Sequence, residues 1–460
     1  MLLCFFLTLE LPYYLTPKVN MSTKSTQHHP KRFLSSGFTL AVTIGGIIGL
    51  GILRTPGEVA EVAPNPFLFV SLWVLGGLFA LLSTIVAAEL ICMTPRSGGS
   101  YSLVRRAYGP FPGFVIGWVD WLSFVSDIAL KAVVVTEFAT LLFPDIAQWQ
   151  VPLAIMVSSV FAALQLKGIA LGANIQQFAA AAIALIIVGF TLALVFSGSA
   201  LDNNTTSFPI QAKGIGSWSL VIAALIYTYD GWLYGAYFSG EVKGGGKAIV
   251  RAAIKGVVIV ILLYTFLAAA LAWKVPLLSL AGNELALAGA LEMVVSPMAS
   301  TIVLVVAIVM TLAHQNVLYM STPRILQAMA VDGLAVKRAK KISKGGNPIF
   351  AVVVSWGLSV FLIIIGGFEF LLHLSVFFHI FVYVLLIAGV IILRKRQPDA
   401  DRPYRAWGHP WSTLICLLGW IALSLFQAVS EIQTAMYAAI MVLISWPIYR
   451  YIIRSRPKKL

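Results

Sequence analysis

The sequence predicts an all-α membrane protein with twelve transmembrane helices. Two observations lead to this fold class. The 460 residues are 59% hydrophobic and only 11% charged, with a mean hydropathy of +0.91, whereas soluble domains carry about 25% charged residues. Apolar runs of about 20 residues, the length that crosses a bilayer, follow one another from about residue 35 to the C-terminal region without a polar linker.

The twelve expected spans form one membrane domain. They cover roughly residues 35–58, 65–92, 113–143, 151–167, 175–197, 217–239, 251–275, 298–330, 349–367, 369–393, 412–430 and 432–453. The first five helices fall within residues 33–198, the next five within residues 215–394, and the last two within residues 410–453.

The distribution of Lys and Arg predicts the orientation, because cytoplasmic loops of membrane proteins are enriched in both. With the N-terminal segment 1–32 inside, most basic residues fall on one side, together with the basic tail 454–460. The opposite loops contain little more than Arg54, Lys213 and Lys274. We therefore expect both termini to be cytoplasmic, and the short loops favour a bacterial inner membrane. The net charge of +14 then needs no nucleic-acid partner.

The first residues do not read as a signal peptide. Residues 1–16 are apolar, but they contain Glu10 and Pro12 and lack a small-residue cleavage site. A polar segment typical of a cytoplasmic N-terminus begins at Met21. Our hypothesis is that translation starts at Met21.

Two of the expected helices are interrupted at membrane depth. The first helix contains a cluster of four glycines, Gly45, Gly46, Gly49 and Gly51. The sixth helix contains Asp230 and Gly231 between aromatic residues. A broken helix exposes N–H groups that suit an anion and C=O groups that suit a cation, and an amino acid presents both charges. Breaks five helices apart indicate an inverted repeat, helices 1 to 5 against helices 6 to 10, with the ligand at the midplane.

Four segments carry a resemblance to a known family. The run Gly46–Ile52 looks like the first-helix motif of the amino acid-polyamine-organocation superfamily. The segments Pro95–Tyr101 and Arg105–Pro110 are similar to that family's loop between helices 2 and 3. The run Tyr227–Trp232, with Glu241, resembles its sixth-helix motif, especially in the L-type amino acid transporter branch.

The resemblance implies a leucine-transporter-like fold, with a 5+5 inverted repeat plus two C-terminal helices, and secondary active transport of amino acids. Sodium-independent transport of neutral L-amino acids by alternating access is expected, with helices 1, 2, 6 and 7 rocking against helices 3, 4, 8 and 9. By the same resemblance, the backbone N–H groups of Leu50 and Gly51 would hold the substrate carboxylate, and Gly49 would allow the turn. The carbonyls of Ile47, Tyr227 and Asp230 would receive the ammonium group. The Tyr227 ring would close over the substrate, as a gate.

Ionisable residues inside apolar helices need a partner or a cavity. Asp127 and Lys131 lie four residues apart and share a helix face, so they either neutralise each other or take part in coupling. His314 is a coupling candidate, because histidine exchanges a proton near neutral pH, or else a packing residue. We interpret His379 as a packing residue, and we expect a structural hydrogen bond for Glu89.

One position departs from the family pattern. Sodium-independent relatives commonly carry a lysine on helix 5, where this chain has an apolar residue near Ile183. Exchange, proton symport and uniport therefore stay open, as does the amino acid that is carried. Few acidic residues line the expected midplane, which favours small or medium neutral substrates over strongly cationic ones.

Other substrates and other classes of membrane protein are alternatives to an amino acid transporter. Amines or other small organic cations are alternative substrates. An intramembrane enzyme lacks support, because the sequence has no HExxH or GxSxG motif and no paired carboxylates at helical spacing in the membrane. A channel would share the topology without needing two broken helices. Cys4, Cys92 and Cys416 have no metal-binding spacing, and we expect no metal and no cofactor. Cys92 lies near the cytoplasmic end of the expected second helix rather than on an external loop, so it gives no sign of a disulfide-linked protein partner.

Overall fold

The computed structural model describes residues 32, 34–198, 215–283, 285–366, 368–430 and 432–454. The hypothesis about Met21 falls outside these residues. So do the predicted loop residue Lys213 and all of the basic tail except Arg454.

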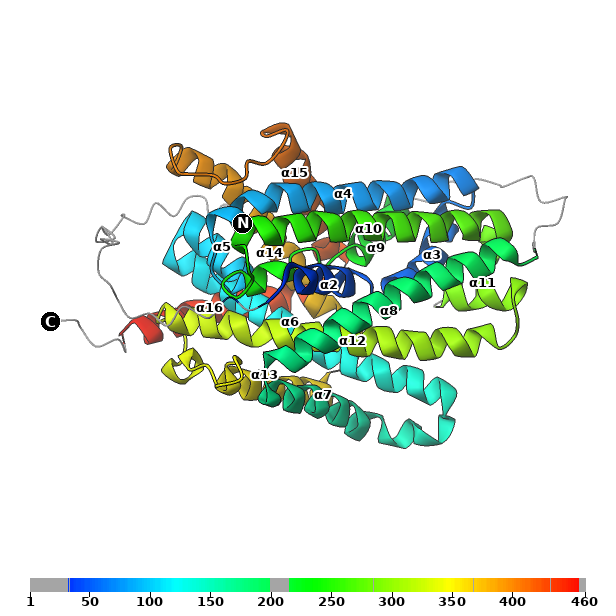
Figure 1. Cartoon of the computed structure of the whole chain (residues 1–460), viewed down its shortest axis with the longest axis horizontal. Coiled ribbons are helices and arrows are strands. Elements are labelled where there is room, and N and C mark those ends of the chain that lie inside the picture. Colours follow the sequence, from blue (N-terminus) through cyan, green and yellow to red (C-terminus); the bar gives the residue numbers. More distant parts are fainter. Residues whose placement is uncertain are drawn as a thin grey trace.

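Helices make up the fold, and most of them run side by side along the long axis of the molecule (Figure 1). They are α2 (Ser36–Ile47), α3 (Gly51–Val62), α4 (Pro66–Met93), α5 (Gly99–Tyr108), α6 (Pro110–Leu142), α7 (Gln150–Lys167), α8 (Ile169–Phe196), α9 (Ile215–Thr228), α10 (Gly245–Lys274), α11 (Ala286–Val294), α12 (Ala299–Val331), α13 (Ile349–Ile365), α14 (Phe368–Arg396), α15 (Trp411–Ser430) and α16 (Ile432–Arg454). Short 3-10 helices are η1 (Pro144–Trp149), η2 (Tyr234–Phe238), η3 (Leu277–Leu280) and η4 (Lys337–Lys340). Within the described residues, β pairing is limited to an isolated bridge between Leu34 and Val242.

Eight of the described helices are long and apolar enough to cross a membrane, or nine if the bent pair α2 and α3 counts as one span. The all-helical class is therefore confirmed, while the count of twelve spans stays a prediction. Helix α6 has the length but carries Asp120, Asp127, Lys131 and Glu137, and α13 has only 17 residues. Helix α9 stops at the second break after 14 residues.

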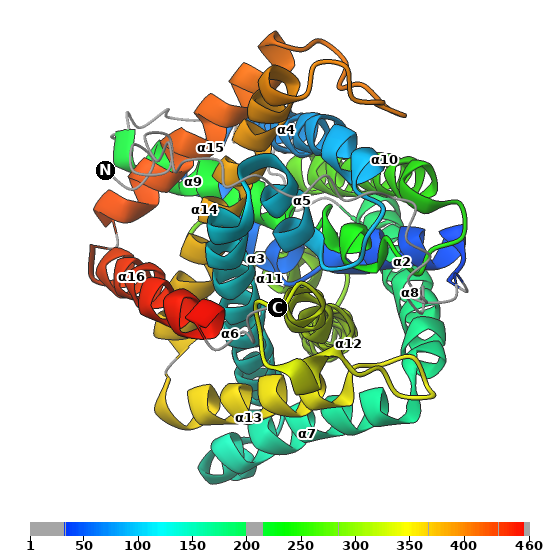
Figure 2. The same ribbon diagram turned by 90° about the vertical axis from the view of Figure 1, so that its left-hand side faces the viewer.

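Seen end-on, α6 and α12 lie in the interior of the bundle, with α7 and α13 at one edge (Figure 2). Helix α12 packs along α6, and α10 packs along α4 and α2. The outer surface is apolar: Phe178 on α8 is 79% exposed and Leu418 on α15 is 64% exposed. Such side chains suit contact with lipid tails, which explains why the helices are apolar on both their inner and outer faces.

The loops that the charge pattern assigns to one side of the membrane meet at one end of the bundle. Arg96 and Arg105 both pair with Asp332, which follows α12. The Ile169 N–H at the start of α8 donates to the carbonyl of Gly345. We call this end the basic-loop end.

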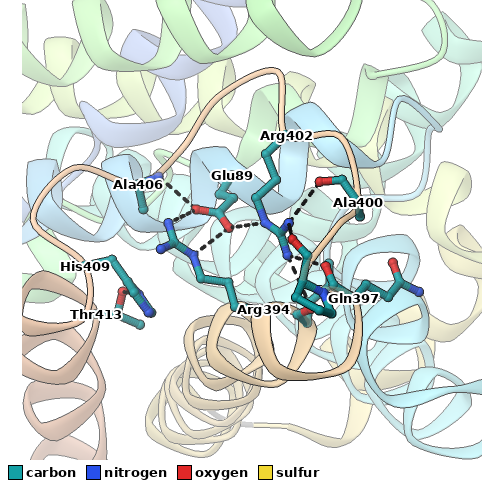
Figure 3. A network of polar contacts seen from close by, with 10 residues as sticks. Glu89, Arg394, Gln397, Ala400, Arg402, Ala406, His409 and Thr413 are labelled. Atoms are coloured by element: carbon teal, nitrogen blue, oxygen red, sulfur yellow. Dashed lines mark hydrogen bonds and ion pairs between the residues drawn. The ribbon is translucent and has the colours of Figure 1, made fainter.

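At the basic-loop end, the buried carboxylate of Glu89 joins α4 to α14 and to the loop after it (Figure 3). Arg394 donates to both carboxylate oxygens at 2.9 and 2.5 Å, and Arg402 donates at 3.1 Å. The Ala406 N–H adds a fourth bond at 2.8 Å. The remaining N–H groups of Arg402 bond to one carbonyl near the end of α14 and to three in the loop after it, including that of Gln397. The structural hydrogen bond expected for Glu89 is confirmed, in the stronger form of ion pairs.

Candidate functional site

The first helix break lies between α2 and α3, which meet at an angle of 42°. Helix α2 ends at Ile47, and Ile48 turns to an extended conformation. Helix α3 begins at Gly51, after Leu50. The first N–H groups of α3 have no preceding turn to bond to, so they are open to a ligand. The carbonyl of Ile47 accepts a hydrogen bond from the Tyr264 hydroxyl at 3.3 Å, which uses one of its two lone pairs.

The second break separates α9 from η2, and Asp230 stabilises it. The Asp230 carboxylate accepts a 2.7 Å bond from the N–H of Gly231 and a 2.5 Å bond from the hydroxyl of Tyr383 on α14. Gly231 has a φ of +111°, which favours glycine. These two hydrogen bonds to Asp230 stabilise the non-helical backbone at the break, in addition to any contact that Asp230 makes with a ligand.

The two breaks touch each other through glycines. A methyl group on Gly231 would lie 2.3 Å from the carbonyl oxygen of Gly46. A methyl group on Gly46 would lie 2.5 Å from the ring of Tyr234. Because neither glycine leaves room for a side chain, the backbones of the two broken helices pack directly against each other.

A small cavity of about 60 Å³ lies at this contact. Its lining includes every residue that the sequence predicted for the site, namely Ile47, Gly49, Leu50, Gly51, Asp127, Lys131, Tyr227, Asp230, Gly231 and His314. Gly46, Thr228, Tyr234 and His379 complete the lining. The structure thus brings together backbone groups from both breaks and ionisable side chains from α6 and α12.

Charged groups form one wall of the cavity. The Lys131 Nζ lies 3.5 Å from Asp127 Oδ1, one turn along α6, so these two residues do form the expected pair. The His314 Nε2 lies 3.7 Å from Asp127 Oδ2 and 3.2 Å from the Tyr234 hydroxyl. Asp127 is therefore held between a lysine and a histidine.

Two buried polar atoms on this wall lack a hydrogen bond from the described residues. His314 Nδ1 has no partner among them, and Asp127 Oδ1 has only the 3.5 Å ion-pair contact with Lys131 Nζ. Buried polar atoms usually do have partners. A ligand with an ammonium or a carboxylate group could supply the missing hydrogen bonds. Gly49 lies beside His314, because a methyl group on Gly49 would be 3.6 Å from His314 Nδ1.

A second cavity of about 30 Å³ adjoins the first between α9, α14 and α15. Both cavities share Tyr227, Asp230 and His379. The other residues of the second cavity are Ala223, Ile226, Val376, Ile380, Tyr383, Trp420 and Leu423. This cavity is mainly apolar, so it suits a carbon side chain rather than a charged group.

The sequence interpretation missed several residues of the cavity. Thr228 belongs to the same motif as Asp230, and Tyr234 follows that motif by two residues, so their closeness in sequence was a usable signal. His379 was interpreted as a packing residue, yet it lines both cavities while its Nδ1 lies 2.9 Å from the Ser375 carbonyl. The sequence around a single histidine in an apolar helix does not indicate whether its side chain faces a cavity or a neighbouring helix.

The sequence is similar to known amino acid transporters, in agreement with the two helix breaks and the cavity between them. A family model described as amino acid permease matches residues 37–446. The chain belongs to the amino acid permease family. This permease is 26% identical to a serine/threonine exchanger of Bacillus subtilis, over 83% of this chain and 88% of that protein. It is 22% identical to a D-serine/D-alanine/glycine transporter of Escherichia coli, over 88% of each chain.

A mammalian relative extends the comparison. The permease is 24% identical to the b(0,+)-type amino acid transporter 1 of Mus musculus, over 83% of this chain and 80% of that protein. These relatives are amino acid transporters of the amino acid-polyamine-organocation superfamily, and members of the L-type branch are among them. The resemblance stated from the motifs is confirmed, and the family is one of transporters rather than enzymes.

Proposed function

We propose that the permease is a secondary active transporter of small neutral amino acids that works by alternating access and without sodium. The single observation that carries this proposal is the cavity where the two broken helices touch. It offers N–H groups at the start of α3, carbonyl groups at the ends of α2 and α9, and a charged wall on α6 and α12. A zwitterion needs this combination of groups.

The proposed contacts follow the two breaks. The N–H groups of Leu50 and Gly51 hold the substrate carboxylate, with Gly49 giving access. The carbonyls of Ile47, Tyr227 and Asp230 receive the ammonium group, and the ring of Tyr227 acts as the gate. Asp127, Lys131 and His314 sense the charge of the bound substrate and form part of the coupling machinery.

The size of the cavity supports a small substrate. A buried water needs roughly 10 to 15 Å³ of such space, so 60 Å³ corresponds to about four to six water-sized groups. Alanine and serine are of this order. The relatives that act on serine, alanine and glycine favour the same class. Amines lack the carboxylate that the start of α3 would bind, and they remain the second candidate.

The proposed movement uses the breaks as hinges. Helices α2 and α3, α4, α9 and α10 would rock against α6, α7, α12 and α13, and the cavity lies between these two groups. The basic-loop end would face the cytoplasm, because Lys and Arg gather there. A bacterial inner membrane with both termini cytoplasmic is part of this proposal.

The experiment is counterflow of radiolabelled amino acids into liposomes that contain the purified permease, in sodium or choline buffer. We expect saturable uptake of a few small neutral amino acids, preferring L-isomers, at the same rate in both buffers. Uptake of amines alone would replace the proposal with the second candidate. Uptake that neither saturates nor distinguishes isomers would indicate a channel.

Gly49→Ala tests the place of the substrate. A methyl group at Gly49 would lie 3.6 Å from His314 Nδ1, an ordinary contact, so the protein should fold normally while the methyl group occupies cavity space. We expect affinity to fall by about tenfold or more, which corresponds to about 1.4 kcal/mol, with an unchanged melting temperature. Gly189→Ala on α8 is the matched control, because a methyl group there meets nothing within 4 Å. Equal affinities of the two variants would contradict the assignment.

A further inference from the structure

A further buried carboxylate, that of Asp120, lies outside the cavity, on the side of the basic-loop end. Asp120 on α6 is only 1% exposed, although it does not line either cavity. It precedes Asp127 by seven residues on α6, whose first residue Pro110 lies at the basic-loop end. Asp120 is thus about 10 Å closer to that end than Asp127.

The partners of Asp120 are hydroxyl groups. The Tyr237 hydroxyl lies 2.9 Å from each carboxylate oxygen. The same hydroxyl lies 3.1 Å from Ser100 Oγ on α5, and either oxygen can be the donor in that contact. Among the described residues, no lysine or arginine forms an ion pair with Asp120.

The other charged and titratable groups around Asp120 are engaged elsewhere. From α5, Arg105 and Tyr101 bond to Asp332, and from α12, Arg324 bonds to Glu241. His314 on α12 faces Asp127. His379 on α14 contacts the carbonyl of Ser375 through its Nδ1 at 2.9 Å. The environment of Asp120 therefore differs from that of Asp127, which has Lys131 on the next turn.

A buried carboxylate without a cation carries a high cost when it is ionised, and a bound proton removes that cost. The hydroxyl chain accommodates both forms. When Asp120 is ionised, Ser100 donates to Tyr237, and Tyr237 donates to the carboxylate. When Asp120 is protonated, the carboxyl group donates to Tyr237, and Tyr237 donates to Ser100. Binding of one proton therefore reverses the donor-to-acceptor direction of both hydrogen bonds.

Aromatic rings connect the hydroxyl groups of Tyr237 and Ser100 to the cavity. The Phe124 ring lies 5.4 Å from Tyr234 and 5.6 Å from His379, both of which line the cavity. The same ring lies 4.9 Å from Tyr237. Tyr234 and Tyr237 belong to η2, directly after the second break, so movement of η2 changes the cavity and the Asp120 contact together.

We propose that Asp120 is a proton-binding residue of the permease, which holds one proton while η2 is closed on α6 and releases it when the basic-loop end opens to water. One proton from the solution outside the cell reaches Asp120 from the cavity side and bonds to a carboxylate oxygen. That O–H bond later breaks as the proton passes to water at the basic-loop end, so that the proton moves inward together with the amino acid. This proposal rests on the proposed function, because it needs an amino acid that the permease carries.

The test measures two activities in the same liposomes, using the amino acid that gives the fastest counterflow. Exchange is measured with equal pH on both sides. Accumulation is measured with an acidic outside, together with an internal pH dye that reports proton entry. For the unmodified permease we expect exchange, accumulation above the outside concentration, and proton entry that depends on the amino acid.

For Asp120→Asn we expect exchange within about threefold of the unmodified permease and at least about tenfold less accumulation, without proton entry. Asp145→Asn is the matched control, because Asp145 is an exposed carboxylate in η1 and both activities should persist. Accumulation and proton entry that persist in Asp120→Asn would overturn the proposal. Exchange without any proton entry in the unmodified permease would overturn it as well, and would leave the proposed function intact. Absence of exchange by the unmodified permease would overturn both.

Tyr237→Phe provides a second variant in case Asp120→Asn does not fold. It removes the hydroxyl group and keeps the ring that packs on Phe124. Loss of the hydrogen bond disfavours the ionised carboxylate more than the neutral one, because hydrogen bonds to charged groups are stronger. We therefore expect the pH of half-maximal accumulation to rise by about one unit, while exchange is retained. An unchanged pH profile in a folded Tyr237→Phe permease would contradict the role of the hydroxyl chain.

Discussion

Gly231→Ala is expected to abolish amino acid uptake by the permease. The φ of +111° at Gly231 is a conformation that alanine rarely adopts, at a cost of about 1 to 3 kcal/mol. A methyl group would also lie 2.3 Å from the carbonyl oxygen of Gly46, which belongs to backbone that cannot move aside alone. The two breaks must then separate, and the groups that line the cavity lose their common geometry. We expect uptake to fall by at least about a hundredfold.

The measurement is initial uptake into liposomes, divided by the amount of permease that elutes as a single peak in gel filtration. Gly357→Ala on α13 is the matched control, because a methyl group there meets nothing within 4 Å. Its uptake should equal that of the unmodified permease. Normal uptake by Gly231→Ala would show that the contact between the two breaks is not needed for transport.

Helices and breaks could be predicted from the sequence because both depend on local composition. An apolar run of bilayer length predicts a helix whatever its neighbours are, and the span expected at 65–92 is observed as Pro66–Met93. Glycine clusters likewise indicate where the backbone can leave the helix. The resemblance then assigned roles to residues on both breaks, and the structure places all of those residues around one cavity.

Contacts between distant helices could not be predicted in this way. Glu89 and Arg394 are 305 residues apart, and only the packing of α4 beside α14 makes them partners. Asp120 gave no signal, because one acidic residue in an apolar helix can face a cavity, a neighbouring helix or a partner. The direction that Asp120 and His379 face depends on the rotation of α6 and α14 in the bundle. One sequence without relatives carries no information about that rotation.

Removing Arg324 alone is expected to destabilise the permease strongly, because its partner carboxylate, that of Glu241, is buried. Arg324 on α12 and Glu241 after η2 are 2% and 6% exposed, and the guanidinium group donates to both carboxylate oxygens at 2.7 and 3.0 Å. Asn347 and the ring of Phe238 also contact Arg324. Arg324→Met leaves the Glu241 carboxylate buried without a cation, which costs about 3 to 5 kcal/mol. The free energy of unfolding in mixed detergent micelles measures this loss.

The double variant Arg324→Met with Glu241→Gln separates the cost of the unpaired charge from the net contribution of the pair. Because replacing a whole buried pair is often nearly neutral, the double variant should recover most of the stability that Arg324→Met loses. Arg54→Met is the surface control: Arg54 pairs with Glu58 at 2.9 Å, but their side chains are 47% and 33% exposed, so the loss should stay below about 1 kcal/mol. If the double variant were as unstable as Arg324→Met, the guanidinium contacts with Asn347 and Phe238, rather than the charge of Glu241, would account for the role of Arg324 at the basic-loop end.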